Sequence, residues 1–112
     1  MAVEFTDNEL TVEGTSIKVR HPIKEALETD DTVLVVLDIP RDVEDPHNVL
    51  AFDTSGRKLW EIEAVQSKHS EKRLPYITVT VKDTQIVAKN WNSHRYEVDA
   101  ETGGVTELGF FK

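Results

Sequence analysis

The chain of 112 residues contains no cysteine. Disulfide scaffolds, thiolate zinc sites and cysteine nucleophiles are therefore excluded. Long apolar runs are absent as well, because the longest, residues 33–37, is far shorter than the roughly 20 residues that cross a bilayer. Residues 1–10 have neither the basic start nor the apolar segment of a signal peptide. From these absences we expect a cytoplasmic protein. We also expect its N-terminal residues to be part of the folded domain.

Basic residues are few, with 13 Lys and Arg against 21 Asp and Glu, and the formal net charge is −8. Duplex nucleic acid and anionic membranes bind clustered positive charge, so neither is an expected partner. The acidic excess is first of all a solvated surface that keeps the domain soluble. It also suits a salt-rich cytoplasm or a protein partner with a basic surface.

Apolar residues alternate with polar ones along most of the chain, which is the pattern of antiparallel strands with one buried face. Residues 2–20 are predicted to form a three-stranded meander, with turns at Asp7-Asn8 and Gly14-Thr15. In the segment 32–39, five consecutive apolar residues predict burial on both faces and hence a central strand.

Three other segments carry weaker patterns. The composition of residues 23–28 favours a helix, but their short length between Pro22 and an Asp-Asp turn favours a strand or one irregular turn. Residues 66–74 are polar and partly basic, and they are predicted to form a long mobile loop. Phe110 and Phe111 are expected to tie the C-terminal tail to the core.

One strand–turn–strand unit occurs twice. The first copy, residues 48–62, turns at Asp53 to Gly56, and the glycine supplies the positive φ that tight hairpins need. The second copy is residues 94–108, in which Asp99 follows Asp53 by 46 residues. Self-similarity at such a period is typical of propeller blades.

The two copies resemble the signature of quinoprotein-type (PQQ-like) propeller blades, in which an Asp, a Thr-Gly or Ser-Gly turn and a Trp recur. The matching segments read NVLAFDTSGRKLW from residue 48 and RYEVDAETGGV from residue 95. The motif order is also similar to that of a small uncharacterised all-β family with no known activity. The motifs concerned are Pro22-Ile23, residues 33–38, Asn48-Val49, Trp60 and Asn90-Trp91. That family has Gly where this chain has Ser93 or His94.

The resemblance implies blade-like units at approximately residues 23–64 and 76–108. Two blades cannot close a propeller, which needs at least about four, so the quinone or metal of a propeller axis is not implied. We expect a single all-β domain over residues 1–112. It is predicted to contain about nine to ten short strands, arranged in antiparallel meanders as a two-sheet sandwich or a partly open barrel.

The sequence offers little for catalysis. The four histidines, His21, His47, His69 and His94, lie one per segment without metal-ligand spacing. The acidic loop at residues 42–47 lacks the Gly and the bidentate Glu of a calcium loop, so we predict a solvated charged loop there. Nucleophile elbows, phosphate-binding glycine loops and dinucleotide fingerprints are missing. We therefore expect no metal, no cofactor and no catalytic residue, and carboxylates that meet across strands are the remaining route to an enzyme.

A candidate binding site surrounds Trp91, because Trp, Tyr and Arg are enriched at binding hot spots. The candidate residues are Asn90, Trp91, Asn92, His94, Arg95 and Tyr96. The alternative is that Trp91 closes one end of the core, while Asn90 and Asn92 bond the turn backbone. Trp60 alternates in phase with Ile62 and is predicted to be buried.

These features predict a non-enzymatic protein-interaction module with an acidic surface. An inhibitor-like or immunity-like protein that masks a basic partner is one concrete form. The alternative is a small-ligand-binding protein or minor hydrolase with a pocket near Trp91, His94 and Arg95. A third interpretation is a structural protein that pairs as a homodimer through an exposed edge strand.

Overall fold

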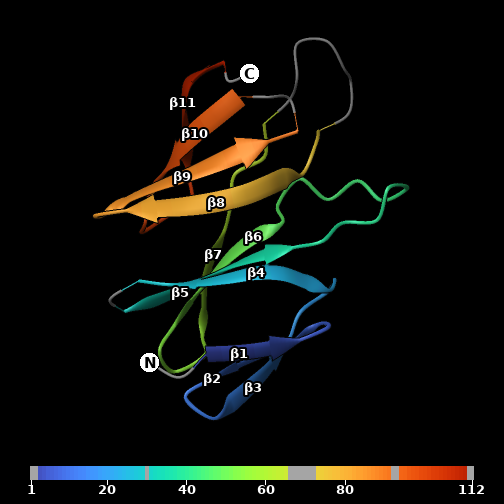
Figure 1. Cartoon of the computed structure of the whole chain (residues 1–112), viewed down its shortest axis with the longest axis vertical. Helices are drawn as coiled ribbons and strands as arrows, with labels where there is room; N and C mark the ends of the chain where they lie inside the picture. Colours follow the sequence, from blue (N-terminus) through green and yellow to red (C-terminus); the bar gives the residue numbers. More distant parts are fainter. Residues whose placement is uncertain (1–2, 30, 66–72, 92–93, 111–112) are drawn as a thin grey trace.

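The computed structural model describes residues 3–29, 31–65, 73–91 and 94–110, which form eleven strands in three antiparallel sheets (Figure 1). The N-terminal sheet contains β1 (Val3–Thr6), β2 (Glu9–Val12) and β3 (Thr15–Lys18). The middle sheet contains β4 (Ile23–Glu28), β5 (Thr32–Leu37), β6 (Val49–Asp53) and β7 (Lys58–Glu61). The C-terminal sheet contains β8 (Tyr76–Lys82), β9 (Gln85–Asn90), β10 (His94–Val98) and β11 (Val105–Phe110).

Each sheet is a meander in which consecutive strands pair in chain order. The sheets follow one another along the long axis of the molecule, with the N-terminal sheet at the bottom of the view and the C-terminal sheet at the top (Figure 1). The all-β prediction is confirmed. The described strands make three sheets and close no barrel, so a two-sheet arrangement is not what the structure shows.

Burial on both faces of the middle sheet explains the run of apolar residues in β5. Val33, Val35 and Leu37 pack in a cluster with Leu10 and Val12 of the N-terminal sheet. The alternate side chains, Leu34 and Val36, pack with residues of the C-terminal sheet. The predicted central strand is therefore confirmed, and the strand option for residues 23–28 is the one observed.

The outer faces of the two flanking sheets are polar. Glu4, Thr11 and Ser16 face away from the core across the N-terminal sheet. Thr80, Glu97 and Thr106 do the same across the C-terminal sheet, where all three are exposed. Apart from Val87, which lies between Thr80 and Glu97, the side chains named here are polar, so these faces offer little apolar surface to a fourth sheet.

In both predicted hairpins an Asp carboxylate caps the turn, but the second turn is one residue longer: the Asp53 N–H donates to the Arg57 carbonyl, and the Asp99 N–H donates to the Gly104 carbonyl. Asp53 Oδ1 accepts bonds from the Ser55 hydroxyl at 2.6 Å and the Arg57 N–H at 3.0 Å, which hold the pKa of Asp53 below its ordinary value. Asp99 Oδ1 accepts from the Glu101 N–H at 2.8 Å. The C-terminal hairpin packs on the middle sheet, where Trp60 Nε1 donates to the Ala100 carbonyl at 2.9 Å.

Two predictions concern parts outside the description. The predicted mobile loop at residues 66–74 falls mostly outside the described residues. The side chains of Phe110 and Phe111 also lie outside them, so the expected anchoring of the tail stays a prediction. Among the described residues there is no helix long and apolar enough to cross a membrane.

Candidate functional site

A groove of about 620 Å³ lies where the connection between β5 and β6 meets the segment that enters β8. We call it the Trp91 groove. Its lining residues are Ile39, Pro40, Arg41, Asp42, Val43, Glu44, Arg73, Leu74, Pro75 and Trp91. In Figure 1 this connection, the β5–β6 loop at residues 38–48, projects beside the start of β8. Six of the lining residues are apolar, and Trp91 exposes 61% of its surface.

The position of the groove walls depends on two buried asparagines. The amide of Asn48 donates to the carbonyls of Leu37 (3.0 Å) and Tyr76 (2.9 Å), and its oxygen accepts from the Tyr76 N–H at 2.7 Å. Asn48 thus joins the base of the β5–β6 loop to the first residue of β8. Because buried polar groups are costly to leave unpaired, these bonds fix the spacing between the two walls.

Asn90 holds Trp91 against the segment that enters β8 in a similar way. Its Nδ2 donates to the Leu74 carbonyl at 2.9 Å, and the N–H of the next residue, Trp91, donates to the Pro75 carbonyl at 3.3 Å. Asn90 is fully buried at the end of β9, where the alternation of the strand turns Trp91 to the opposite side. The indole is therefore exposed beside Leu74 and Pro75 by the pleat of the strand.

Arg20 fixes the far end of the β5–β6 loop. Its guanidinium bonds Asp45 (Nε to Oδ2, 2.7 Å), the His47 carbonyl (2.8 Å) and Glu61 of β7 (2.8 Å). Burial alone would raise the pKa values of both carboxyls. For Asp45 the bonds from Arg20 outweigh burial, and for Glu61 those from Lys58 and Arg20 do, so both pKa values lie below their ordinary values.

The charges around the groove are only partly paired. Arg73 Nε lies 3.6 Å from Glu44 Oε2, so these two side chains form an ion pair across the groove. Arg41 and Asp42 are exposed and have no ion-pair partner among the described residues. The groove therefore combines an apolar lining with one cation and one anion that are available to a ligand.

The structure disperses the site residues predicted from the sequence. Trp91 lines the groove, so the interpretation that it closes the core is wrong. Asn90 is buried and bonds Leu74, which is a backbone bond of the expected kind but outside its own turn. Asn92 lies outside the described residues.

The other three predicted residues belong to β10. Tyr96 is buried, with its ring centroid 6.1 Å from that of Tyr76 in an edge-on arrangement. His94 stacks on Tyr96 and lies 3.3 Å from the carboxylate of Glu107. Arg95 is exposed. None of the three is among the described residues that line the Trp91 groove, so the structure does not bring them together with Trp91 there.

Sequence reasoning missed the groove-lining residues of the β5–β6 loop, which it interpreted as a solvated charged loop. The available signal was the isolated Val43 between charged residues, together with Pro40 on one wall and Pro75 on the other. Val43 exposes 39% of its surface, but single exposed apolar side chains are common, so this signal alone does not identify a groove.

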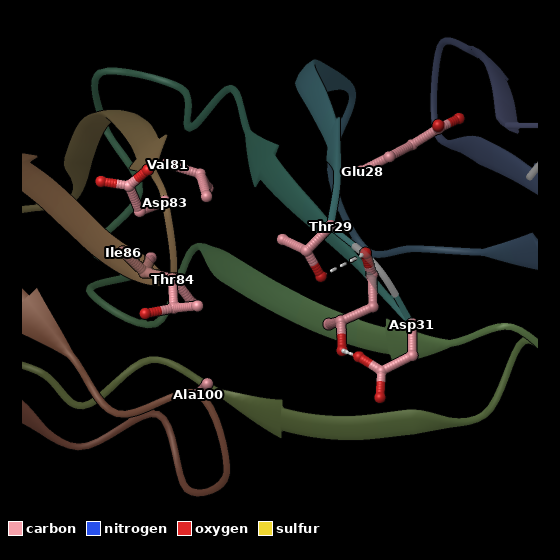
Figure 2. A pocket seen from close by; sticks show the side chains of 9 residues that line it. Glu28, Thr29, Asp31, Val81, Asp83, Thr84, Ile86 and Ala100 are labelled. Carbon is pink, nitrogen blue, oxygen red and sulfur yellow. Dashed lines mark hydrogen bonds between the residues drawn. The ribbon is translucent and has the colours of Figure 1, made fainter.

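A second groove, of about 480 Å³, lies between the β4–β5 and β8–β9 turns (Figure 2). It is lined by three carboxylates, Glu28, Asp31 and Asp83, together with threonines. Figure 2 shows Glu28 pointing away from Asp83, so the carboxylates do not converge. The described residues contain no group of three or more His, Cys, Asp or Glu that could hold a metal ion. The arrangement provides no paired acid and base.

Comparison with known proteins gives one match over nearly the whole chain. The sequence model of a family described as a domain of unknown function (DUF7957) matches residues 1–110. No curated protein matches the chain.

Proposed function

This chain belongs to the DUF7957 family, and we propose that it is a non-enzymatic protein-interaction module that binds its partner through the Trp91 groove. The observation that carries the proposal is the 61% exposure of Trp91 over an apolar lining. Large aromatic side chains dominate the energetics of protein interfaces. A tryptophan that the fold exposes, rather than buries, is available for that role.

Preorganisation of the groove supports the proposal. Asn48, Asn90 and Arg20 hold its walls through hydrogen bonds from elements that are far apart in the sequence. Binding to walls that are already ordered costs less conformational entropy than binding to a loop that must fold first. The acidic surface adds long-range attraction for a basic partner.

Affinity capture with the whole chain tests the proposal. We expect a partner that the wild type captures to be lost with Trp91→Ala, and the purified partner to bind this variant at least about 30-fold more weakly, as for a hot-spot residue. Leu108→Ala is the matched control, since Leu108 is 44% exposed on β11 and lies outside the groove. Equal binding of the wild type and Trp91→Ala would rule out the groove as the binding surface.

A small ligand is the second candidate, because a groove of about 620 Å³ falls within the usual size range of small-molecule sites. A small-ligand function predicts that a metabolite-sized compound raises the melting temperature of the wild type but not of Trp91→Ala. Such a compound would act without any protein partner.

A further inference from the structure

We infer that the occupant of the Trp91 groove is a segment of a basic protein that places one bulky apolar side chain against Trp91, next to Lys or Arg. This inference rests on the proposed function and specifies the chemistry of the partner. It follows from the lining of the groove, from the backbone carbonyls that are already engaged there and from the charge around it.

The lining calls for an apolar side chain. Trp91, Leu74 and Pro75 form one side, and Ile39, Pro40 and Val43 form the other. Burying a Leu-sized side chain between them removes apolar surface from water on both partners. The volume of about 620 Å³ holds one large side chain and its immediate neighbours, not a folded domain.

We expect recognition to use mainly side chains, because two lining carbonyls are already engaged. The Pro75 carbonyl accepts from the Trp91 N–H, and the Pro40 carbonyl accepts from the Val43 N–H at 3.0 Å. Pro40 and Pro75 also have no N–H to offer. Addition of the partner as a further strand would need free donors and acceptors in alternation, and these prolines break that pattern.

The charge of the loop selects a cation. Residues 38–48 contain four carboxylates, Asp38, Asp42, Glu44 and Asp45, and a single Lys or Arg, Arg41. Asp45 is paired with Arg20 and Glu44 with Arg73. Asp42 in the lining and Asp38 outside it are exposed and have no ion-pair partner among the described residues, so the loop as a whole has one more open carboxylate than open guanidinium. The net charge of −8 acts in the same direction.

The test uses the whole chain, labelled with ¹⁵N, and synthetic peptides. The first peptide, GSGKLKGSG, carries Leu between two Lys residues. Its relatives replace both Lys by Glu, both Lys by Gln, or Leu by Ser. The readout is the Trp91 indole N–H signal, assigned by its loss in Trp91→Ala. We expect the Lys peptide to shift this signal with the highest affinity and to weaken as salt is added.

Charge variants of the loop give an independent readout. Asp42→Asn is expected to weaken the Lys peptide about two- to fivefold, the range of an exposed ion pair, and Arg41→Gln to strengthen it by a similar factor. Glu4→Gln is the matched control, because this exposed carboxylate lies on the outer face of the N-terminal sheet. It is expected to leave the affinity unchanged.

Four results would overturn the inference. The Gln or Glu peptide could shift Trp91 as strongly as the Lys peptide, which would remove the charge preference but keep the groove as a binding surface. The Ser peptide could bind as well as the Leu peptide, or the Lys peptide could bind Trp91→Ala with unchanged affinity, as measured from the backbone amide signals of the labelled variant. Either result would show attraction to the acidic surface alone. The peptides could all leave Trp91 unshifted, and affinity capture would then still decide the proposed function.

Discussion

Asn48 forms the bonds that a neighbouring peptide group would form in a sheet. Its amide donates to the Tyr76 carbonyl and accepts from the Tyr76 N–H, and it also donates to Leu37. The side chain is 1% exposed, so water cannot replace these bonds if they are lost. Asn48 therefore connects the middle and C-terminal sheets at the base of the Trp91 groove.

We predict that Asn48→Leu lowers the free energy of unfolding by about 2–4 kcal/mol, because it leaves the Tyr76 N–H and C=O unpaired in the interior. Urea denaturation followed by far-UV circular dichroism measures the change. Gln85→Leu, at an exposed position of β9, is expected to stay within about 0.5 kcal/mol of the wild type. A similar, small change in both variants would mean that the Asn48 bonds contribute little.

The two tryptophans show what sequence patterns reveal about single residues. Trp60 alternates in phase with Ile62, and its predicted burial is confirmed at 6% exposure. Trp91 follows the last residue of a strand and has no apolar partner two positions on. The alternation of Ile86, Ala88 and Asn90 already turns it away from the core, but Asn90 breaks the apolar pattern that would have revealed this. The burial of Asn90 depends on the Leu74 carbonyl, a tertiary contact that no local pattern predicts.

At the scale of elements, the C-terminal hairpin packs so tightly on the middle sheet that it requires a glycine. A Cβ added to Gly103 would lie 2.6 Å from Trp60 Cε3 and 2.9 Å from the Glu61 carbonyl oxygen. Gly14, in the turn between β2 and β3, has an equally positive φ, +82° against +78°, but nothing lies within 4 Å of its added Cβ. A substitution at Gly14 therefore tests backbone strain alone, whereas a substitution at Gly103 tests backbone strain together with overpacking.

We predict that Gly14→Ala costs about 1 kcal/mol, which is the strain of a positive φ. Gly103→Ala is expected to cost about 1–3 kcal/mol more, because overpacking adds to the same strain. Thermal and urea unfolding of the two variants measure the difference. Equal costs would show that the Trp60 ring moves aside without penalty.

The sequence was sufficient to predict most of the individual strands, about nine to ten against the eleven observed, but not the number of layers. Alternation in residues 3–18 gives one buried face, and the apolar run in β5 gives two. Two sheets share only two inner faces, so a doubly buried sheet requires a third layer. The sequence contains that count of faces, but no local pattern shows which face the N-terminal meander covers. The likeness of the hairpins to quinoprotein-type blades stays a prediction.

At the scale of the whole molecule, Arg20 ties together parts that are distant in the chain. It follows β3 and binds the β5–β6 loop through Asp45 and the middle sheet through Glu61. Both carboxyls have pKa values below their ordinary values of 3.8 and 4.5. A lowered pKa means that the pairing contributes stability above the ordinary value, and that this contribution is lost as the pH falls through the lower, folded value.

We therefore predict that Arg20→Gln destabilises the protein by about 1–2 kcal/mol at pH 7, and that this difference from the wild type shrinks as the pH is lowered below about 4. The shrinkage follows because protonated Asp45 and Glu61 no longer attract Arg20. Urea denaturation at pH 7, 5 and 3 measures both unfolding energies. Arg57→Gln is the matched control, since Arg57 is 78% exposed and lies 3.6 Å from Asp53, and an exposed pair contributes little. A difference for Arg20→Gln that persists unchanged at pH 3 would show that Arg20 acts through packing, not through its two carboxylates.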